Sequence, residues 1–207
     1  MLKLNVNNET SKLLAVVLGT AKSNGPAPKL EDCYDPKSRE NVLANTYPTE
    51  IDMVDELNQL EEVLVKHNVK LYRPEVINDY NQIFSRDIGF VIDDFFVVAN
   101  ILPDRSNEIF AIQKVLDLIP KNKIIEFPVD CHIEGGDVIL HNDYIFIGTY
   151  DGDDYSDFKT ARTNYKAIKF LKEKFTEKKI IPFDLIKSDL EPTKNASVSY
   201  THLRAHE

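Results

Sequence analysis

The sequence is poor in cysteine, glycine and positive charge. Its 207 residues include 2 cysteines and 7 glycines, and 25 Lys+Arg stand against 34 Asp+Glu, which gives a net charge of −9. Two cysteines are too few for the disulfide framework of a small secreted protein. The acidic balance lacks the basic surface with which proteins neutralise a phosphate backbone, so we expect no nucleic-acid partner.

Long apolar runs are missing as well. The longest, at 95–102, is interrupted by Asn100 and is far shorter than the roughly 20 residues that span a bilayer. Residues 1–12 are polar and lack the apolar stretch of a secretory signal. We therefore expect a cytoplasmic protein without a membrane partner. Its 43% hydrophobic and 29% charged residues exclude the disordered and fibrous classes.

The sequence does contain a repeated pattern of an apolar hairpin, an amphipathic helix and a short strand. Aromatic and β-branched residues on both sides of a polar turn predict each hairpin. Apolar residues at three- and four-residue steps predict each helix. The hairpins are expected at 90–98 and 138–147, the helices at 109–119 and 165–175, and the closing strands at 123–128 and 179–184.

An earlier unit fits a similar plan, with a strand at 13–19, a helix at 51–67 and a strand at 70–74. Between its first strand and its helix, residues 21–48 are rich in Pro, Gly, Asn, Asp and Lys and predict a long loop. Three units of about fifty residues indicate an α/β array in which neighbouring units bury one another's apolar faces.

An acidic motif precedes each of the two predicted hairpins. Residues 81–87 read Asn-Gln-Ile-Phe-Ser-Arg-Asp, and residues 132–137 read His-Ile-Glu-Gly-Gly-Asp. Asp87 and Glu134 thus hold nearly equivalent places in successive units, and both point into one central funnel if the units close around an axis. Facing carboxylates bind a planar cation with several N–H donors, so guanidinium is the natural candidate. The glycines after Glu134 would let the backbone approach a ligand or form a bulge.

These motifs, together with the opening segment 9–19, resemble the guanidino-group-modifying (pentein) superfamily. That superfamily includes arginine deiminase, dimethylarginine dimethylaminohydrolase and the amidinotransferases. The resemblance covers nearly all of residues 1–196 and implies a five-bladed α/β propeller of ββαβ modules, of which this chain holds about three. Residues 1–197 are then an incomplete catalytic domain. The resemblance also implies a cysteine thiolate that attacks the guanidino carbon and a histidine that acts as general acid and base.

Carried over residue by residue, the resemblance assigns catalytic roles to Asp87 and Glu134. Asp87 would clamp the guanidinium group, and Glu134 would hold its other side and assist proton transfer. The ligand is a small arginine-like guanidino compound, and Arg162 would meet its carboxylate. No cofactor or metal is expected, and Asp151–Asp154 lacks the later ligands of a calcium loop. The expected substrate-binding residues are Asn81, Phe84, Arg86, Gly135 and Arg162.

The sequence departs from the family pattern where the catalytic histidine and cysteine are expected. The His-x-Asp element should follow residues 191–196, and the cysteine lies near the end of the full-length enzymes; neither is present here. Residues 198–207 resemble a translated sequencing adapter. We therefore interpret the chain as a truncated fragment with a non-native tail, inactive by itself. An open propeller exposes apolar strand edges, so self-association or marginal stability is expected.

Cys131 and His132 are not expected to replace the missing pair. Neighbouring residues on a strand point to opposite faces, so they cannot act as nucleophile and base there. Cys131 is interpreted as a packed residue.

Three functions stay open at this point. The motifs favour a deiminase-like hydrolase of arginine or a related compound. An amidinotransferase differs only in the nucleophile that resolves the covalent intermediate. A non-catalytic propeller that binds a ligand or a protein is the third alternative.

Overall fold

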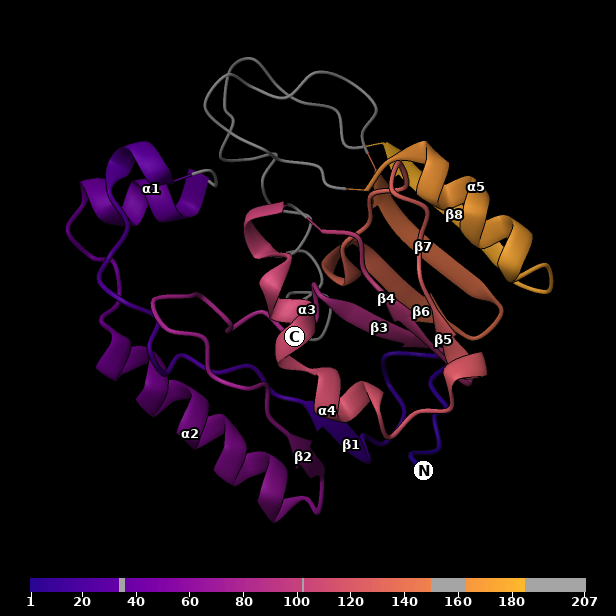
Figure 1. Ribbon diagram of the computed structural model, residues 1–207, viewed down its shortest axis with the longest axis horizontal. Helices are drawn as coiled ribbons and strands as arrows, with labels where there is room; N and C mark the ends of the chain where they lie inside the picture. The colour runs from indigo at the N-terminus through magenta and orange to yellow at the C-terminus, as the bar shows by residue number, and fades with distance from the viewer. Residues whose placement is uncertain (34–35, 102, 150–162, 185–207) are drawn as a thin grey trace.

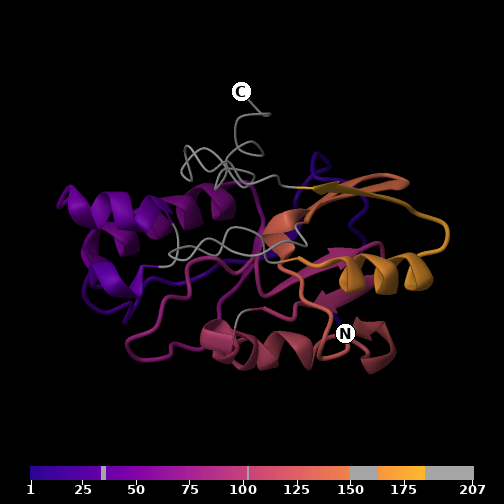
Figure 2. The ribbon, with the colours of Figure 1, turned by 90° about the horizontal axis from the view of Figure 1, so that it is seen from above.

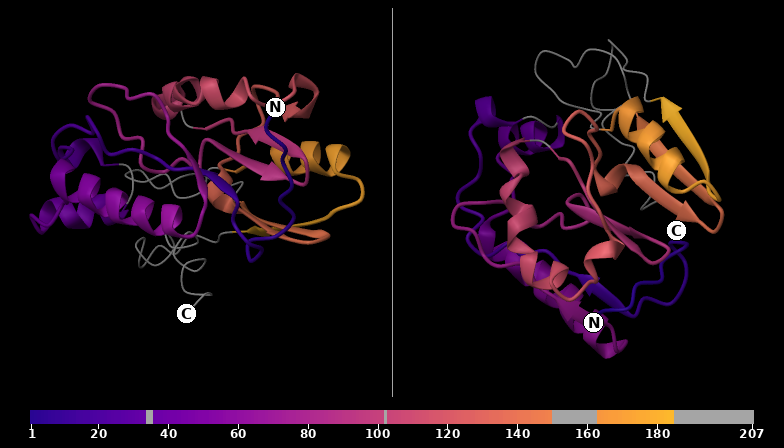
Figure 3. Two further views of the ribbon diagram at one scale, coloured as in Figure 1. Left: turned by 90° about the horizontal axis from the view of Figure 1, so that it is seen from below. Right: turned by 45° about the vertical axis from the view of Figure 1, so that its right-hand side comes forward.

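The computed structural model describes residues 1–33, 36–101, 103–149 and 163–184. Within these ranges the strands form three separate small sheets with helices packed beside them (Figure 1). Two further directions of view show α2 and α5 at opposite ends of the molecule (Figures 2 and 3). The predicted α/β class is confirmed.

The first sheet pairs β1, Ala15–Val17, in parallel with β2, Lys70–Tyr72. The predicted helix before β2 is α2, which covers Glu50–Lys66 and starts within one residue of the predicted position. It begins there because Thr49 forms a capping box. The Thr49 hydroxyl accepts from the N–H of Asp52 at 3.2 Å, and the Thr49 N–H donates to the Asp52 carboxylate at 3.1 Å.

The loop predicted for 21–48 contains two helical segments, so that prediction was wrong in part. A 3₁₀ turn covers Leu30–Asp32, and α1 covers Pro36–Leu43. Proline is favoured at the first position of a helix because its missing N–H would have no partner there. Five of the eight residues of α1 are polar, and no apolar periodicity marks the helix.

The second unit has the predicted hairpin. β3, Gly89–Ile92, pairs with β4, Phe95–Val98, and β4 pairs in parallel with β5, Ile124–Ile125. The single helix predicted for 109–119 is instead broken. A 3₁₀ turn at Pro103–Arg105 leads into α3 at Asn107–Ala111 and α4 at Gln113–Leu116. The break falls at Ile112, whose backbone angles of −100° and 12° leave the helical region.

The third unit matches its prediction more closely. β6 pairs with β7 in a hairpin, and β7 pairs in parallel with β8 across the whole of both strands. The Asn164 side chain caps α5 by accepting from the N–H of Ala167 at 3.0 Å. The elements are β6 at Val138–His141, β7 at Tyr144–Thr149, α5 at Tyr165–Lys174 and β8 at Lys179–Asp184.

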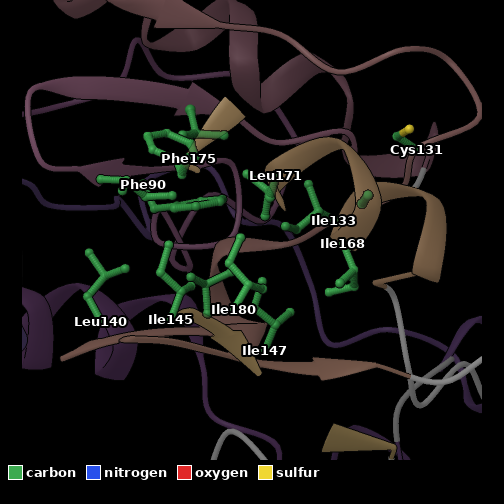
Figure 4. Close-up of a cluster of buried hydrophobic side chains, with 14 residues drawn as sticks. Phe90, Cys131, Ile133, Leu140, Ile145, Ile147, Ile168, Leu171, Phe175 and Ile180 are labelled. Atoms are coloured by element: carbon green, nitrogen blue, oxygen red, sulfur yellow. The ribbon is translucent and has the colours of Figure 1, made fainter. Parts of the chain in front are cut away.

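One hydrophobic core joins the second and third units. Side chains from β3, β4, β6, β7, β8 and α5 meet in this cluster (Figure 4). Ile133, fully buried, belongs to it and stands immediately before Glu134. The N-terminal segment ties the two hairpins together from outside, through bridges of Val6 with Asp93 and of Asn8 with His141. None of the helices in the described ranges is long and apolar enough to cross a bilayer.

Replacing Ile133 with alanine tests how much this shared core contributes. Ile133→Ala leaves a cavity beside the Glu134 motif, and we expect the free energy of unfolding to fall by about 2–5 kcal/mol. The matched control is Ile51→Ala on α2, where the side chain is 74% exposed and a change within about 0.5 kcal/mol is expected. Chemical denaturation measures both, and equal losses would contradict the assignment of Ile133 to the core.

Candidate functional site

The structure brings the two acidic motifs into direct backbone contact. The N–H of Gly135 donates to the carbonyl of Asp87 at 3.1 Å. Arg86 crosses the same junction, because its Nε donates to the Gly135 carbonyl at 3.0 Å and its Nη2 donates to the Val138 carbonyl at 2.8 Å. A Cβ on Gly135 would lie 2.1 Å from the Arg86 carbonyl oxygen, so the approach requires glycine. Segments almost fifty residues apart therefore lie in direct contact.

The end of β4 holds the second motif in place. Asn100 pairs with Ile133 in an isolated bridge, where the Ile133 N–H donates to the Asn100 carbonyl at 3.2 Å. The Asn100 side chain donates to the carbonyl of Cys131 at 2.9 Å. Asn100 thus fixes the chain on the approach to Glu134, while Ile133 anchors it in the core.

Asp87 presents its two carboxylate oxygens to different neighbours. Oδ2 accepts from Nη1 of Arg105 at 2.7 Å. Oδ1 lies over Gly136, where an added Cβ would be only 2.6 Å away. The Asp87 side chain remains 18% exposed. One oxygen is therefore anchored by a cation of the protein, and the other lies next to the second motif.

Glu134 is buried, and the end of β7 and the start of α5 support its backbone. Its N–H donates to the hydroxyl of Thr163 at 3.4 Å, and that hydroxyl donates to the Asp137 carboxylate. The Thr163 carbonyl accepts from the Thr149 hydroxyl at 2.6 Å. This chain of hydrogen bonds connects the Glu-Gly-Gly-Asp motif to the third sheet.

Sequence reasoning missed Arg105 and Glu108, which form a buried ion pair at the site. Glu108 accepts from Nε of Arg105 at 2.6 Å and from Nη2 at 3.1 Å. Burial raises the pKa of Glu108, and its bonds to Arg105 counteract the rise. Burial opposes the charge of Arg105, yet the bonds and charges of Glu108 and Asp87 hold its pKa above the ordinary value. The signal in the sequence was an Arg-x-x-Glu spacing, which is common on exposed helix faces.

The other predicted site residues have different surroundings. Asn81 is exposed, and its side chain accepts from the N–H of Ile83 at 3.1 Å, which forms a local turn. Phe84 is 58% exposed. The guanidinium group of Arg86, besides its two carbonyl bonds, pairs with Glu9 at 2.9 Å. Arg86 therefore braces the two motifs and the N-terminal segment, and its expected part in ligand binding stays a prediction.

Several predictions fall outside the described residues. These are the carboxylate-binding role of Arg162, the interpretation that Asp151–Asp154 does not form a calcium loop, and the non-native tail at 198–207. Among the residues that the structure does describe, no three side chains of the His, Cys, Asp and Glu types come together as a metal site would require.

Cys131 and His132 have different surroundings, although not for the predicted reason. They lie between a turn at 129–130 and the bridge residue Ile133, in a segment that belongs to no strand. Cys131 is buried at the edge of the core cluster, whereas His132 is exposed (Figure 4). Burial raises the pKa of the Cys131 thiol, and the nearby Asp130 carboxylate raises it further. Both effects disfavour the thiolate that nucleophilic attack requires.

Similar solved structures come from enzymes that act on guanidino groups. SxtG, an amidinotransferase of the saxitoxin pathway of Microseira wollei, has a TM-score of 0.65 at 19% identity and covers 87% of this chain and 62% of its own. The N-terminal domain of ArgZ, a cyanobacterial arginine dihydrolase, has a TM-score of 0.62 at 12% identity. The match covers 84% of this chain and 59% of the ArgZ chain. Dimethylarginine dimethylaminohydrolase from Pseudomonas aeruginosa has a TM-score of 0.57 at 12% identity, with 84% and 62% covered. At these identities the likeness shows a shared fold.

The sequence comparisons reach less far. No protein-family model matches the chain. The uncharacterized protein YkgA of Bacillus subtilis (strain 168) is 32% identical over 135 residues, which are 63% of this chain and 42% of YkgA. The chain therefore spans under half of this relative and about three fifths of the similar solved structures.

The two glycines of the second motif should respond differently to alanine. At Gly135 the new Cβ meets backbone, which cannot yield locally, so we expect Gly135→Ala to lower the free energy of unfolding by about 1–3 kcal/mol. At Gly136 it meets only the carboxylate end of the Asp87 side chain, which can shift more readily than backbone, so Gly136→Ala should cost less. Urea denaturation of both variants measures the difference. Equal costs would mean that the close backbone approach at Gly135 does not hold the motifs together.

Proposed function

We propose that this chain, which has the fold of the guanidino-group-modifying (pentein) superfamily, provides the guanidinium-binding carboxylates of a hydrolase that acts on arginine or a related compound. The observation that carries the proposal is the hydrogen bond from the Gly135 N–H to the Asp87 carbonyl, which sets the two acidic motifs side by side. The similar structures of an arginine dihydrolase and a dimethylaminohydrolase support the choice of substrate class.

The proposed binding step follows from the charges. A guanidinium ion is planar and carries several N–H donors, so it forms charge-assisted bonds with more than one carboxylate. Oδ1 of Asp87 would receive one edge of the ion, since Oδ2 is anchored by Arg105. Glu134 would hold another edge and assist proton transfer from its buried position.

The proposed reaction needs a nucleophile as well. In the mechanism that the resemblance implies, a thiolate adds to the guanidino carbon, the C–N bond to the leaving amine breaks, and water resolves the covalent intermediate. The two cysteines of this sequence, Cys33 and Cys131, are both buried. We therefore propose that the chain binds its ligand without turning it over.

The finer architecture belongs to the same proposal. Two units with the order hairpin, helix, strand, and a first unit with one parallel pair, support about three modules of a five-module α/β propeller. Exposed apolar side chains such as Leu14 and Phe183 support the proposal that the open array associates with itself.

Amidino transfer is the second candidate, because the amidinotransferase SxtG has a TM-score of 0.65 and the arginine dihydrolase domain has one of 0.62. A product assay on the full-length gene product that carries this sequence separates them. Citrulline and ammonia from arginine alone support the hydrolase, whereas ornithine that appears only with an added amine supports transfer. Binding without either product supports a non-catalytic binding protein.

Binding of L-arginine tests the two carboxylates directly. We expect Asp87→Asn and Glu134→Gln each to weaken binding by roughly tenfold to a hundredfold, because each loses a charge-assisted bond. Asp143→Asn, at an exposed hairpin turn, removes the same charge elsewhere and should leave the affinity unchanged. Isothermal titration calorimetry measures the affinities, and thermal unfolding confirms that each variant is folded. Equal losses in all three variants would sink the assignment of the site.

The proposed lack of turnover is tested by incubating the 207-residue chain with L-arginine. Neither citrulline nor ammonia should accumulate above the rate without protein. Sustained product formation would overturn the interpretation of the chain as inactive, and loss of that activity in Cys131→Ser would then identify the buried thiol as the nucleophile.

A further inference from the structure

We propose that Glu108 is a positioning residue that makes the Asp87 site selective for a cation, and that it acts through Arg105. The inference rests on the proposed function and deepens it, because it names the residue that sets the charge of the ligand. The proposed roles of the acidic motifs leave Glu108 unassigned. Its carboxylate accepts hydrogen bonds from the guanidinium group of Arg105, which in turn donates to Asp87.

The geometry divides Arg105 unequally between two carboxylates. Glu108 accepts two hydrogen bonds from one edge of the guanidinium group, at 2.6 Å from Nε and at 3.1 Å from Nη2. Asp87 takes one bond of 2.7 Å from Nη1. Bidentate pairs between arginine and a carboxylate are the stronger arrangement. The charge of Arg105 is therefore balanced mainly by Glu108, and Asp87 keeps charge available on the oxygen beside Gly136.

Burial makes this balance matter. Glu108 is 1% exposed and Arg105 is 8% exposed, so water and salt screen their charges poorly. Asp87, Arg105 and Glu108 together carry one net negative charge. If Glu108 were uncharged, Asp87 alone would balance the positive charge of Arg105. The three residues together would then have no net charge. A cationic ligand arriving at Asp87 would then lose its attraction and meet the positive charge of Arg105 beside it.

A purely structural role for Glu108 leads to a different expectation. If Glu108 only held α3 and Arg105 in place, its loss would loosen the site for every ligand of the same shape. If Glu108 sets the charge of the site, its loss should weaken the binding of a cationic ligand and leave the binding of a neutral one unchanged. L-arginine and L-citrulline provide that pair, since the second carries a neutral ureido group in place of guanidinium.

The test is Glu108→Gln, which keeps the size and one acceptor but removes the charge. Titration followed by amide NMR shifts measures dissociation constants for both ligands, including weak ones. We expect the affinity for L-arginine to fall by at least about tenfold and that for L-citrulline to change by less than about threefold. The control is Asp117→Asn, an exposed residue after α4 that removes the same formal charge and should change neither affinity.

A double variant distinguishes the loss of charge at Glu108 from a loss of the fold. Arg105→Gln with Glu108→Gln removes both buried charges and returns the group to the single negative charge of Asp87, so the preference for L-arginine should persist. An unchanged preference in Glu108→Gln, an equal loss for both ligands, or a lost preference in the double variant would overturn the inference and leave the proposed function standing. A wild-type chain that binds no L-arginine would overturn both.

Discussion

The close contact between two backbones at Gly135 is the constraint on which the candidate site depends. The 3.1 Å bond from its N–H to the Asp87 carbonyl leaves no room for a side chain, because a Cβ would meet the Arg86 carbonyl oxygen at 2.1 Å. Arg86 then reinforces the junction with bonds to the carbonyls of Gly135 and Val138. A hydrophobic core shared by the second and third units holds the two backbones at this distance. The motifs that carry Asp87 and Glu134 lie side by side because both requirements are met.

A buried cation between two carboxylates is the second defining feature. Such pairs contribute little net stability, since desolvation opposes the attraction between the charges, but leaving one member unpaired is costly. The Arg105 and Glu108 pair therefore constrains the region around Asp87 strongly without being a main source of folding energy. The pair is anchored at the start of the helical segment, where the 3₁₀ turn gives way to α3. The break at Ile112 keeps this segment short.

Predictions from the sequence were accurate where a periodic apolar pattern was flanked by residues that favour a turn or a helix start. The hairpins at 90–98 and 138–147 formed at the polar turns that were expected, and Asp93 and Asn142 take the positive φ angles that tight turns require. The helix expected at 51–67 is α2, Glu50–Lys66, and the structure shows that the Thr49 capping box sets its start. Predictions were less accurate where tertiary contacts override local preference. The polar helix α1 had no apolar stripe to reveal it, and the helix expected at 109–119 is broken.

The sequence by itself determined the α/β class, the order of elements in two units and the identity of the paired acidic motifs, because these depend on local periodicity and spacing. Only the tertiary structure decided which atoms meet. It turned Arg86 toward carbonyl groups and Glu9, and it buried Arg105 with Glu108 beside Asp87. The physical reason is that burial and charge pairing arise between segments far apart in the chain. The same Arg-x-x-Glu spacing describes an exposed pair and a buried one, and packing alone distinguishes them.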